Sequence, residues 1–328
     1  LPAVVTITLA LGAQRMLKQN ALIRKLPAVE TLGSVTVICS DKTGTLTENR
    51  MTVVVLDVAG HELDLTEEMD KHGSIRKVNV EEDQNAASLS LLAIGGTLCN
   101  DAQMINTGDG LFHTLGDPTE GSLVAAAAKM GFWKSTLDSS FPRAAELPFD
   151  SERKRMTTVH HLGQYDPTVL AGLEIGDHRY IAFTKGSVDG LLGLSNQVWV
   201  NGQLQRMDDS FKVRVEAANE RLAKKGMRVL GVAFRMMNQI PEVIQTDLEQ
   251  NLTFIGLFGM IDPPREEVRD AVAITKSAGI RTVMITGDHP LTAQAVAREL
   301  GLLKTGRVVT GAELDDISDE DFKREVET

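Results

Sequence analysis

Two short runs of apolar, mostly β-branched residues each end in polar residues that include an aspartate. The first run covers residues 34–41 (SVTVICSD) and the second covers residues 281–288 (RTVMITGD). Runs of this length without alternation are typical of strands covered on both faces, as in a parallel sheet. We therefore predict two buried parallel strands, and we predict that Cys39 in the first of them is a packing residue.

The residues on both sides of the second run follow a helical pattern. Residues 262–279 begin with aspartate and proline and end with glycine, which are favoured at the start and just past the end of a helix. Asp262 is accordingly an expected N-cap. Residues 290–300 predict a second helix that ends before Gly301. Two helices flanking one of two distant apolar strands predict an α/β domain with a parallel sheet.

The middle of the chain has a different pattern. Residues 119–130 and 208–225 predict helices, and the pair Asn201-Gly202 between two strand-like runs predicts a hairpin turn. Four further runs predict strands, at residues 156–162, 179–184, 197–200 and 228–235. Strands joined by hairpins predict a mainly antiparallel sheet. An α+β domain over residues 53–258 is therefore expected to interrupt the α/β domain.

Composition limits the class of protein. The 328 residues correspond to roughly two domains, and 42% apolar with 24% charged residues is ordinary for a folded chain. The net charge of −11 argues against nucleic acid as the main partner. Two cysteines cannot form a disulfide framework, which fits a reducing compartment. His160 and His161 have no partners at metal-ligand spacing, so we predict that they lie on the surface of a strand.

The first residues carry no charge up to Ala13. This stretch is shorter than the roughly 20 residues of a membrane span, so it is either the last half of a span or a buried helix. Four basic residues follow it: Arg15, Lys18, Arg24 and Lys25. Because basic residues follow a span on its cytoplasmic side, we expect residues 1–14 to be the end of a truncated transmembrane helix at the cytoplasmic face.

The segment SDKTGTLT (residues 40–47) directly follows the first predicted strand. Ligand sites in open parallel sheets lie at this end of the strands. The Asp41 carboxylate can attack a phosphorus atom and form an acyl phosphate. Gly44 permits a tight turn, while Thr43 and Thr45 supply donors for phosphate oxygens. Mg²⁺ suits a site of carboxylate and phosphate ligands.

The longer string ICSDKTGTLTENRMTV resembles the phosphorylation signature of P-type ATPases, the ATP-driven cation pumps. Further segments match the family in order: GDPTE (116–120), LPF (147–149) with Lys154, KG (185–186), MRVL (227–230), DPPR (262–265) and TGD (286–288). The resemblance implies an α/β, haloacid-dehalogenase-like phosphorylation domain with a Rossmann-like parallel sheet, interrupted by an inserted α+β nucleotide-binding domain. It implies a stalk and first part of the phosphorylation domain at 15–52, the nucleotide-binding domain at 53–258 and the second part at 259–328.

The resemblance also implies catalytic roles. Asp41 would be the phosphorylated nucleophile, in a string that includes Lys42. The Asp41 carboxylate and the Thr43 carbonyl would help to hold Mg²⁺. Thr286 and Gly287 would contact the transferred phosphate. Asp288 would bind nucleotide or metal, or else cap the following helix.

The nucleotide site implied by the resemblance consists of Glu120, Phe149, Lys154, Lys185, Gly186, Arg228, Asp262 and Arg265. Phe149 would stack on adenine, Glu120 would reach its amino group, and Lys154 and Lys185 would meet phosphates. Arg228 would bridge to the phosphates, while Gly186 would let the backbone come close. Asp262 and Arg265, at the domain junction, would contact nucleotide and act in a hinge, with helix capping as the alternative.

The transported ion is expected to be Ca²⁺, because residues 1–3, 26–32 and 259–265 are most similar to the Ca²⁺-transporting branch. Na⁺/K⁺-type and H⁺-type pumps are alternatives, as are a soluble dehalogenase-like phosphatase and a nucleotide-binding module without catalysis. The family's downstream string GDGxNDxP is absent from the sequence. We therefore expect the chain to bind ATP without steady hydrolysis, and to need the actuator and transmembrane domains of the same polypeptide for transport.

Overall fold

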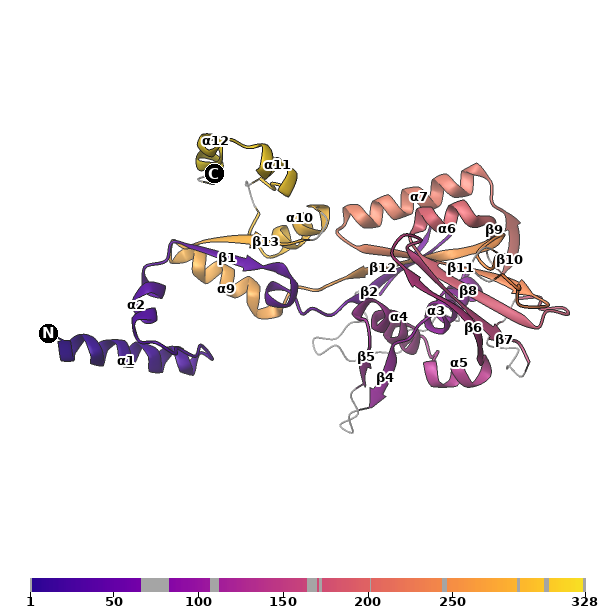
Figure 1. Cartoon of the computed structure of the whole chain (residues 1–328), viewed down its shortest axis with the longest axis horizontal. Coiled ribbons are helices and arrows are strands. Elements are labelled where there is room, and N and C mark those ends of the chain that lie inside the picture. The colour runs from indigo at the N-terminus through magenta and orange to yellow at the C-terminus, as the bar shows by residue number, and fades with distance from the viewer. Residues whose placement is uncertain are drawn as a thin grey trace. The chain divides into compact units, whose positions relative to one another are not determined.

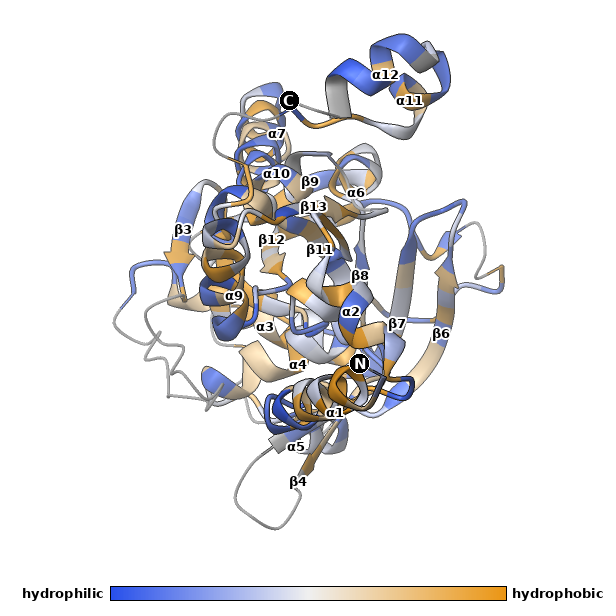
Figure 2. Cartoon of the chain, turned by 90° about the vertical axis from the view of Figure 1, so that its left-hand side faces the viewer, coloured by the Kyte–Doolittle hydropathy of each residue, from blue (hydrophilic) through white to orange (hydrophobic). Residues whose placement is uncertain are grey.

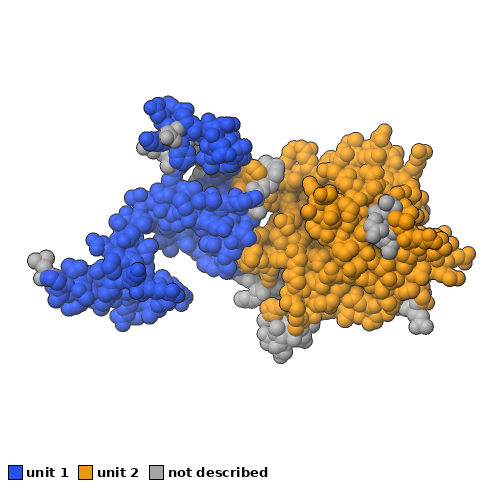
Figure 3. All heavy atoms as spheres, in the orientation of Figure 1, with its two compact units in different colours: residues 1–46, 264–288, 296–328 blue, residues 47–263, 289–295 orange. Residues whose placement is uncertain are grey.

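The computed structural model describes residues 2–65, 83–106, 112–163, 170, 173–200, 202–243, 247–287, 290–303 and 307–326. The described chain is a mixed α/β structure that divides into two compact units (Figure 3). Unit 1 consists of Leu1–Leu46, Pro264–Asp288 and Val296–Thr328. Unit 2 consists of Thr47–Pro263 and His289–Ala295. The larger part of unit 2 is thus one continuous segment, whereas unit 1 is assembled from separate segments.

A single large sheet forms the centre of unit 2 (Figure 1). Among the described residues it runs in the order β10-β9-β12-β11-β8-β7-β6, and β2 pairs with β12 and with β3. The pairs are antiparallel except that β9 and β12 are parallel. The strands are β2 (Thr52–Val58), β3 (His61–Asp64), β6 (Arg143–Asp150), β7 (Arg155–His161), β8 (Tyr180–Gly186), β9 (Ser195–Val200), β10 (Gln203–Arg206), β11 (Arg228–Met237) and β12 (Leu252–Ile261).

Helices cover both faces of this sheet. The helices α3 (Ala86–Leu98), α4 (Pro118–Lys129) and α5 (Lys134–Ser140) share one apolar core with Phe258 of β12. On the other face, α6 (Val188–Leu194) and α7 (Asp209–Lys224) share a second core with Leu257. Figure 1 shows these two groups on opposite sides of the strands. Because neighbouring strand residues point to opposite faces, β12 is buried along nearly its whole length.

The packing of α3 against the sheet depends on two glycines. A Cβ atom on Gly95 would lie 2.7 Å from Phe183, and one on Gly96 would lie 2.8 Å from Phe258. The helix therefore approaches the sheet more closely than any other residue type would allow. A separate hairpin of β4 (Gln103–Asn106) and β5 (Phe112–Leu115) follows α3 in the chain.

Most elements expected in this part of the chain are confirmed. Helices α4 and α7 and strands β7, β8, β9 and β11 match the predicted ranges within a few residues. The predicted hairpin joins β9 to β10, and Gly202 has a φ of 76°; Asn201 lies outside the described residues. Helix α3 and strand β12 were not predicted, since both are apolar on every side and lack a diagnostic period.

Unit 1 contains the two predicted parallel strands. β1 (Val37–Asp41) and β13 (Arg281–Ile285) pair in parallel, with Cys39 opposite Val283. A small core formed with α9 (Glu266–Ser277) and α10 (Pro290–Glu299) consists of Leu46, Val268, Val272, Val296 and Leu300, with Met284 and Leu302 against it. The other helices are α1 (Pro2–Lys18), α2 (Pro27–Gly33), α11 (Gly311–Asp316) and α12 (Asp319–Val326).

Two expectations for unit 1 are wrong. The helix expected from residue 262 begins at Glu266, with Arg265 in the N-cap position, so Asp262 does not cap it. The first strand is not buried: exposed and half-buried residues alternate along β1, and Cys39 is exposed. The physical reason is that β13 is the one strand paired with β1 in the described part of the chain. The predicted C-terminal glycine is correct, since Gly279 has a φ of 75° just past α9.

Helix α1 carries apolar residues along much of its length (orange in Figure 2). None of its residues is buried, and Val4 and Ile7 are among the exposed ones. Across the described residues, no helix combines the length and the apolar character that a membrane crossing requires.

Candidate functional site

The predicted phosphorylation loop leaves the C-terminal end of β1. Asp41 is the last residue of this strand, and its Oδ1 atom accepts a hydrogen bond from the Thr43 amide at 3.3 Å. Gly44 has a φ of 74°, in the left-handed region that glycine enters without steric cost. Arg265 braces this turn: its guanidinium donates to the Gly44 carbonyl at 3.2 Å, and its amide donates to the Leu46 carbonyl at 3.0 Å.

The parallel register places the second predicted phosphate-contacting segment at the same edge. Asp41 pairs with Ile285, so Thr286 and Gly287 follow β13 where the phosphorylation loop follows β1. Lys42 is buried directly after Asp41. Asp288 lies outside the described residues. The structure therefore brings both predicted segments of unit 1 to the carboxyl end of one parallel strand pair.

The oxygen donors of this loop suit a hard divalent cation. Asp41 offers a carboxylate and Thr43 a backbone carbonyl, and Mg²⁺ usually binds one or two carboxylates together with water and substrate phosphate. Such a donor set fits a site completed by phosphate rather than a closed protein cage. Consistently, no cluster of three or more His, Cys, Asp or Glu side chains in the described ranges forms a metal site by itself.

In unit 2 two of the predicted nucleotide residues, Lys185 and Glu120, are in direct contact. Lys185 of β8 is 6% exposed, and its ammonium donates to the Glu120 carboxylate and to the Cys99 carbonyl. Glu120 is in the first turn of α4 and also accepts from the Asp101 amide at 3.1 Å. The α4 N-terminus is capped by Asp117, whose carboxylate accepts from the amides of Thr119 and Glu120.

The C-terminal end of α3 attracts cations. Besides Lys185, Lys134 donates to the carbonyls of Thr97 and Asn100, and the Arg143 guanidinium donates to that of Asn100 at 2.8 Å. Carbonyls at a helix C-terminus lack intrahelical partners and carry partial negative charge, which such donors satisfy. Lys134 and Arg143 were not predicted as members of this group, because nothing in the sequence indicates that they meet this helix end.

Phe149 and Lys154 lie at the two ends of the turn between β6 and β7. Phe149 is 65% exposed, although an apolar side chain of this size is usually buried. Lys154 is exposed and has a φ of 51°. A Cβ atom on Gly186 would lie 2.5 Å from Arg155 and 2.7 Å from the Lys154 carbonyl. Gly186 thus lets this turn pack directly against the end of β8, beside Lys185.

Two further predicted residues join neighbouring segments. Arg228 of β11 donates to the Thr119 hydroxyl at 2.9 Å, next to Glu120. Asp262 accepts from the Thr47 hydroxyl at 2.5 Å and from the Arg50 amide at 3.2 Å. Asp262 therefore ties the end of β12 to the segment that leads into β2. This contact replaces the helix cap expected from the sequence.

The expectation that His160 lies on the surface is wrong. His160 is 1% exposed, and its ring lies within hydrogen-bond distance of the Phe141 carbonyl (2.8 Å) and the Thr158 hydroxyl (2.9 Å). Burial lowers the pKa of His160 to about 4, so the ring is neutral at physiological pH. His161, the next residue, is exposed. The two histidines differ because successive strand residues point to opposite faces.

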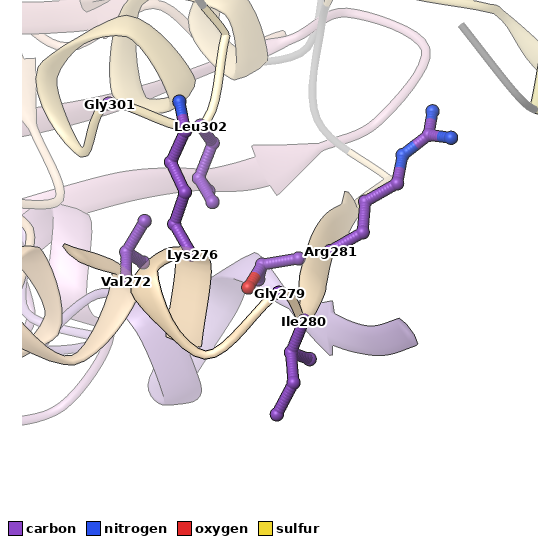
Figure 4. Close-up of a pocket in the computed structure, with 8 residues that line it drawn as sticks. Val272, Lys276, Gly279, Ile280, Arg281, Gly301 and Leu302 are labelled. Carbon is purple, nitrogen blue, oxygen red and sulfur yellow. The ribbon is translucent and has the colours of Figure 1, made fainter. Parts of the chain in front are cut away.

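A hollow of about 310 Å³ in unit 1 is separate from these sites (Figure 4). It is lined by Val272, Lys276, Gly279, Ile280, Arg281, Thr282, Gly301 and Leu302. Arg281 begins β13, whereas the phosphorylation loop lies where β1 and β13 end. Lys276 and Arg281 extend in different directions in Figure 4, so they do not converge on one ligand position.

Comparison with known proteins finds a family model and relatives that match this chain. The family model described as "P-type ATPase, cytoplasmic domain N" matches residues 88–267. Calcium-transporting ATPase 1 of Bacillus cereus is 42% identical over 328 residues, which is all of this chain and 33% of that protein. Calcium-transporting ATPase 1 of Lactococcus lactis is 40% identical over 330 residues, and the calcium-transporting ATPase of Bacillus subtilis is 39% identical over 333. These alignments cover all of this chain and 34% and 36% of the relatives.

The chain belongs to the P-type ATPase family, because the family model covers more than half of it. It spans about a third of the length of the curated relatives it matches.

Proposed function

We propose that this chain binds ATP in unit 2 and accepts the γ-phosphoryl group on Asp41 of unit 1, as the catalytic part of an ATP-driven cation pump. The observation that carries the proposal is the buried Lys185–Glu120 pair beside the turn of Phe149 and Lys154. A desolvated ammonium on the strand that packs against a turn with an exposed aromatic ring offers a nucleotide both a cation and a stacking surface.

In unit 2, Phe149 stacks on the adenine ring and Glu120 accepts a hydrogen bond from the adenine amino group. Lys154 and Lys185 contact phosphate oxygens, and Arg228, already held by Thr119, bridges toward the same phosphates. The Lys185–Glu120 pair orients the ammonium before the nucleotide arrives. Such preorganisation lowers the entropy lost on binding.

In unit 1, the strand end carries the chemistry of a haloacid-dehalogenase-like phosphorylation domain. A carboxylate oxygen of Asp41 attacks the γ-phosphorus, the bond from that phosphorus to its bridging oxygen breaks, and ADP leaves with the electron pair. Thr286 and Gly287 donate hydrogen bonds to the transferred phosphoryl group. Lys42 and Asp288 are the other catalytic residues of this site. Asp41 and the Thr43 carbonyl would hold Mg²⁺, which would supply positive charge to offset the negative charge of the reactants.

The roles of the remaining segments follow from the same proposal. Residues 53–258 form the nucleotide-binding domain, while residues 15–52 and 259–328 form the phosphorylation domain. Asp262 and Arg265 act at the domain junction. Asp262 accepts a hydrogen bond from the Thr47 hydroxyl, and Arg265 donates to the Gly44 carbonyl. Residues 1–14 end a transmembrane helix, so the chain works at the cytoplasmic face of a membrane with the actuator and transmembrane domains of its polypeptide. The transported ion is Ca²⁺, as the names of the relatives suggest.

A titration of ATP into the chain, followed through its amide NMR signals, tests this proposal. We expect saturable binding that weakens at least about tenfold in both Phe149→Ala and Lys185→Ala, since each removes a direct contact. Phe322→Ala is the matched control, because Phe322 is also an exposed phenylalanine, 46% exposed, but belongs to α12 of unit 1. Binding that is absent, or unchanged in both variants while the chain remains folded, contradicts the proposal.

The phosphoryl step has its own test. Incubation with γ-labelled ATP and Mg²⁺ is expected to label the chain, and the label should be absent in Asp41→Asn. Hydroxylamine should release the label from the chain, as expected for an acyl phosphate. ATP binding without any label, indifferent to Asp41→Asn, would support a nucleotide-binding module without catalysis.

A further inference from the structure

A charged cluster in unit 2, outside the residues predicted from sequence, lies behind the turn of Phe149 and Lys154. Its centre is Glu249, which is 4% exposed and precedes β12. The Glu249 carboxylate accepts from Arg153 at 2.6 Å, from Arg155 at 2.5 Å and from the Thr157 hydroxyl at 2.9 Å. A carboxylate is costly to bury unless such donors surround it. Glu249 thus fixes the position of both arginines.

The two arginines extend this restraint to the backbone of the turn. The Arg153 guanidinium also donates to the Pro148 carbonyl at 2.6 Å, directly before Phe149. The Arg155 guanidinium donates to the Arg153 carbonyl at 3.2 Å, directly before Lys154. The peptide groups that precede Phe149 and Lys154 are therefore both tied, each through one guanidinium, to the same buried carboxylate.

The turn itself holds a conformation that side-chain-bearing residues rarely adopt. Lys154 has a φ of 51°, and its amide donates to the Asp150 carbonyl at 2.7 Å. The Asp150 carboxylate accepts from the amides of Glu152 and Arg153, both at 2.9 Å. A backbone strained in this way persists only when its surroundings determine it. Asp150 restrains the turn through hydrogen bonds within it. The Glu249 cluster restrains the same turn through a buried carboxylate outside it.

We propose that Glu249 is a positioning residue for nucleotide binding, which acts through Arg153 and Arg155 on the turn that presents Phe149 and Lys154. The inference rests on the proposed function, because it assumes that this turn meets a nucleotide. Glu249 itself faces the interior and does not contact the ligand. Its effect is to hold the aromatic ring and the ammonium at a fixed separation before binding, so that less conformational freedom is lost.

The charge balance makes the carboxylate indispensable to this arrangement. The Glu249 carboxylate is hydrogen-bonded to two guanidinium groups whose own interaction is repulsive, and the Asp150 carboxylate also attracts both. In Glu249→Gln the side chain keeps its size, but the Glu249 share of the attraction that offsets this repulsion is gone. We expect the arginines to separate and the turn to lose the link between the peptide groups before Phe149 and Lys154.

The test measures ATP and AMP affinity of the 328-residue chain by calorimetry, together with the amide shifts of Phe149 and Lys154 without nucleotide. Glu249→Gln is expected to weaken both ligands about tenfold, since adenine stacking is common to both, and to shift both amides. The matched control is Asp57→Asn. Asp57 is another buried carboxylate of unit 2, 1% exposed and paired with Arg221 at 3.2 Å, and its loss should lower stability without changing either affinity.

A second variant keeps the test decisive if Glu249→Gln does not fold. Arg153→Gln removes the ion pair with Glu249 and the link to Pro148, at a side chain that is 24% exposed, and leaves Arg155 on Glu249. It should weaken ATP binding with the Phe149 amide shifted. ATP affinity within about twofold of the unaltered chain in a folded Glu249→Gln, or in Arg153→Gln, overturns the inference while leaving the proposed function intact. Absence of ATP binding by the unaltered chain, or no effect of Lys185→Ala, overturns the proposed function itself.

Discussion

Each unit carries a predicted functional segment, but the apolar core that packs beneath this segment differs greatly in size between the two units. In unit 2 the predicted nucleotide residues lie on and beside a large sheet that has an apolar core on each face. In unit 1 the phosphorylation loop follows a pair of strands whose first member alternates between exposed and half-buried residues. We infer that unit 2 carries its own stability, whereas Asp41 depends on a much smaller core.

The largest effect is expected from the core of unit 2. Phe258→Ala removes a fully buried ring that packs against Gly96, and should lower the free energy of unfolding by about 3–5 kcal/mol. Urea unfolding followed by tryptophan fluorescence measures it, because Trp199 is buried in the same core. An equally large loss in Phe322→Ala, where the ring is on the surface of α12, would contradict the contrast between the units.

The pH dependence of unit 2 should reveal its buried histidine. His160 has a pKa of about 4 in the folded chain, against about 6.5 when unfolded. The unfolded chain therefore binds the extra proton between these values, and stability falls as pH decreases from about 6.5 to 4, by about 3 kcal/mol in total. The free energy of unfolding should differ less between pH 7.5 and pH 5 in His160→Gln than in the unaltered chain. The control His161→Gln, at an exposed position, should retain the full pH dependence.

The close approach of α3 to the sheet gives an intermediate effect. A Cβ atom at Gly96 would lie 2.8 Å from Phe258, so Gly96→Ala should destabilise unit 2 by about 1–3 kcal/mol. Gly193 of α6 has no atom within 4 Å of such a Cβ. Gly193→Ala should therefore leave the melting temperature unchanged or raise it slightly. Equal destabilisation in the two variants would argue against the packing described for α3.

The smallest effects compare one helix cap from each unit. Asp117 caps α4, which packs in the core of unit 2, and Asp117→Ala should cost about 1 kcal/mol. Thr310 caps α11, a short helix without buried residues, and Thr310→Ala should cost less than about 0.5 kcal/mol. Thermal unfolding of both variants measures the difference. A larger loss for Thr310→Ala would show that unit 1 contributes more stability than its core suggests.

The sequence was a reliable guide where a local signal was present. The ranges of α4 and α7, the strands β7, β8, β9 and β11, the hairpin between β9 and β10 and the parallel pairing of β1 with β13 match the expectations. It failed where burial depends on distant neighbours. His160 is buried by Phe141 and its surroundings, and Cys39 is exposed because β1 has one strand beside it in the described residues. Asp262 was expected to begin a helix and instead holds Thr47 and Arg50.

The candidate site divides in the same way. By itself, the sequence determined which residue types stand at the strand end after Asp41 and which segments match the P-type ATPase family, because those signals are contiguous in the chain. Only the tertiary structure decided that Lys185 meets Glu120 and the end of α3, and that Glu249 holds the arginines beside Phe149 and Lys154. These contacts join residues far apart in sequence, and their energy comes from burial and charge pairing that exist only once the sheet has formed.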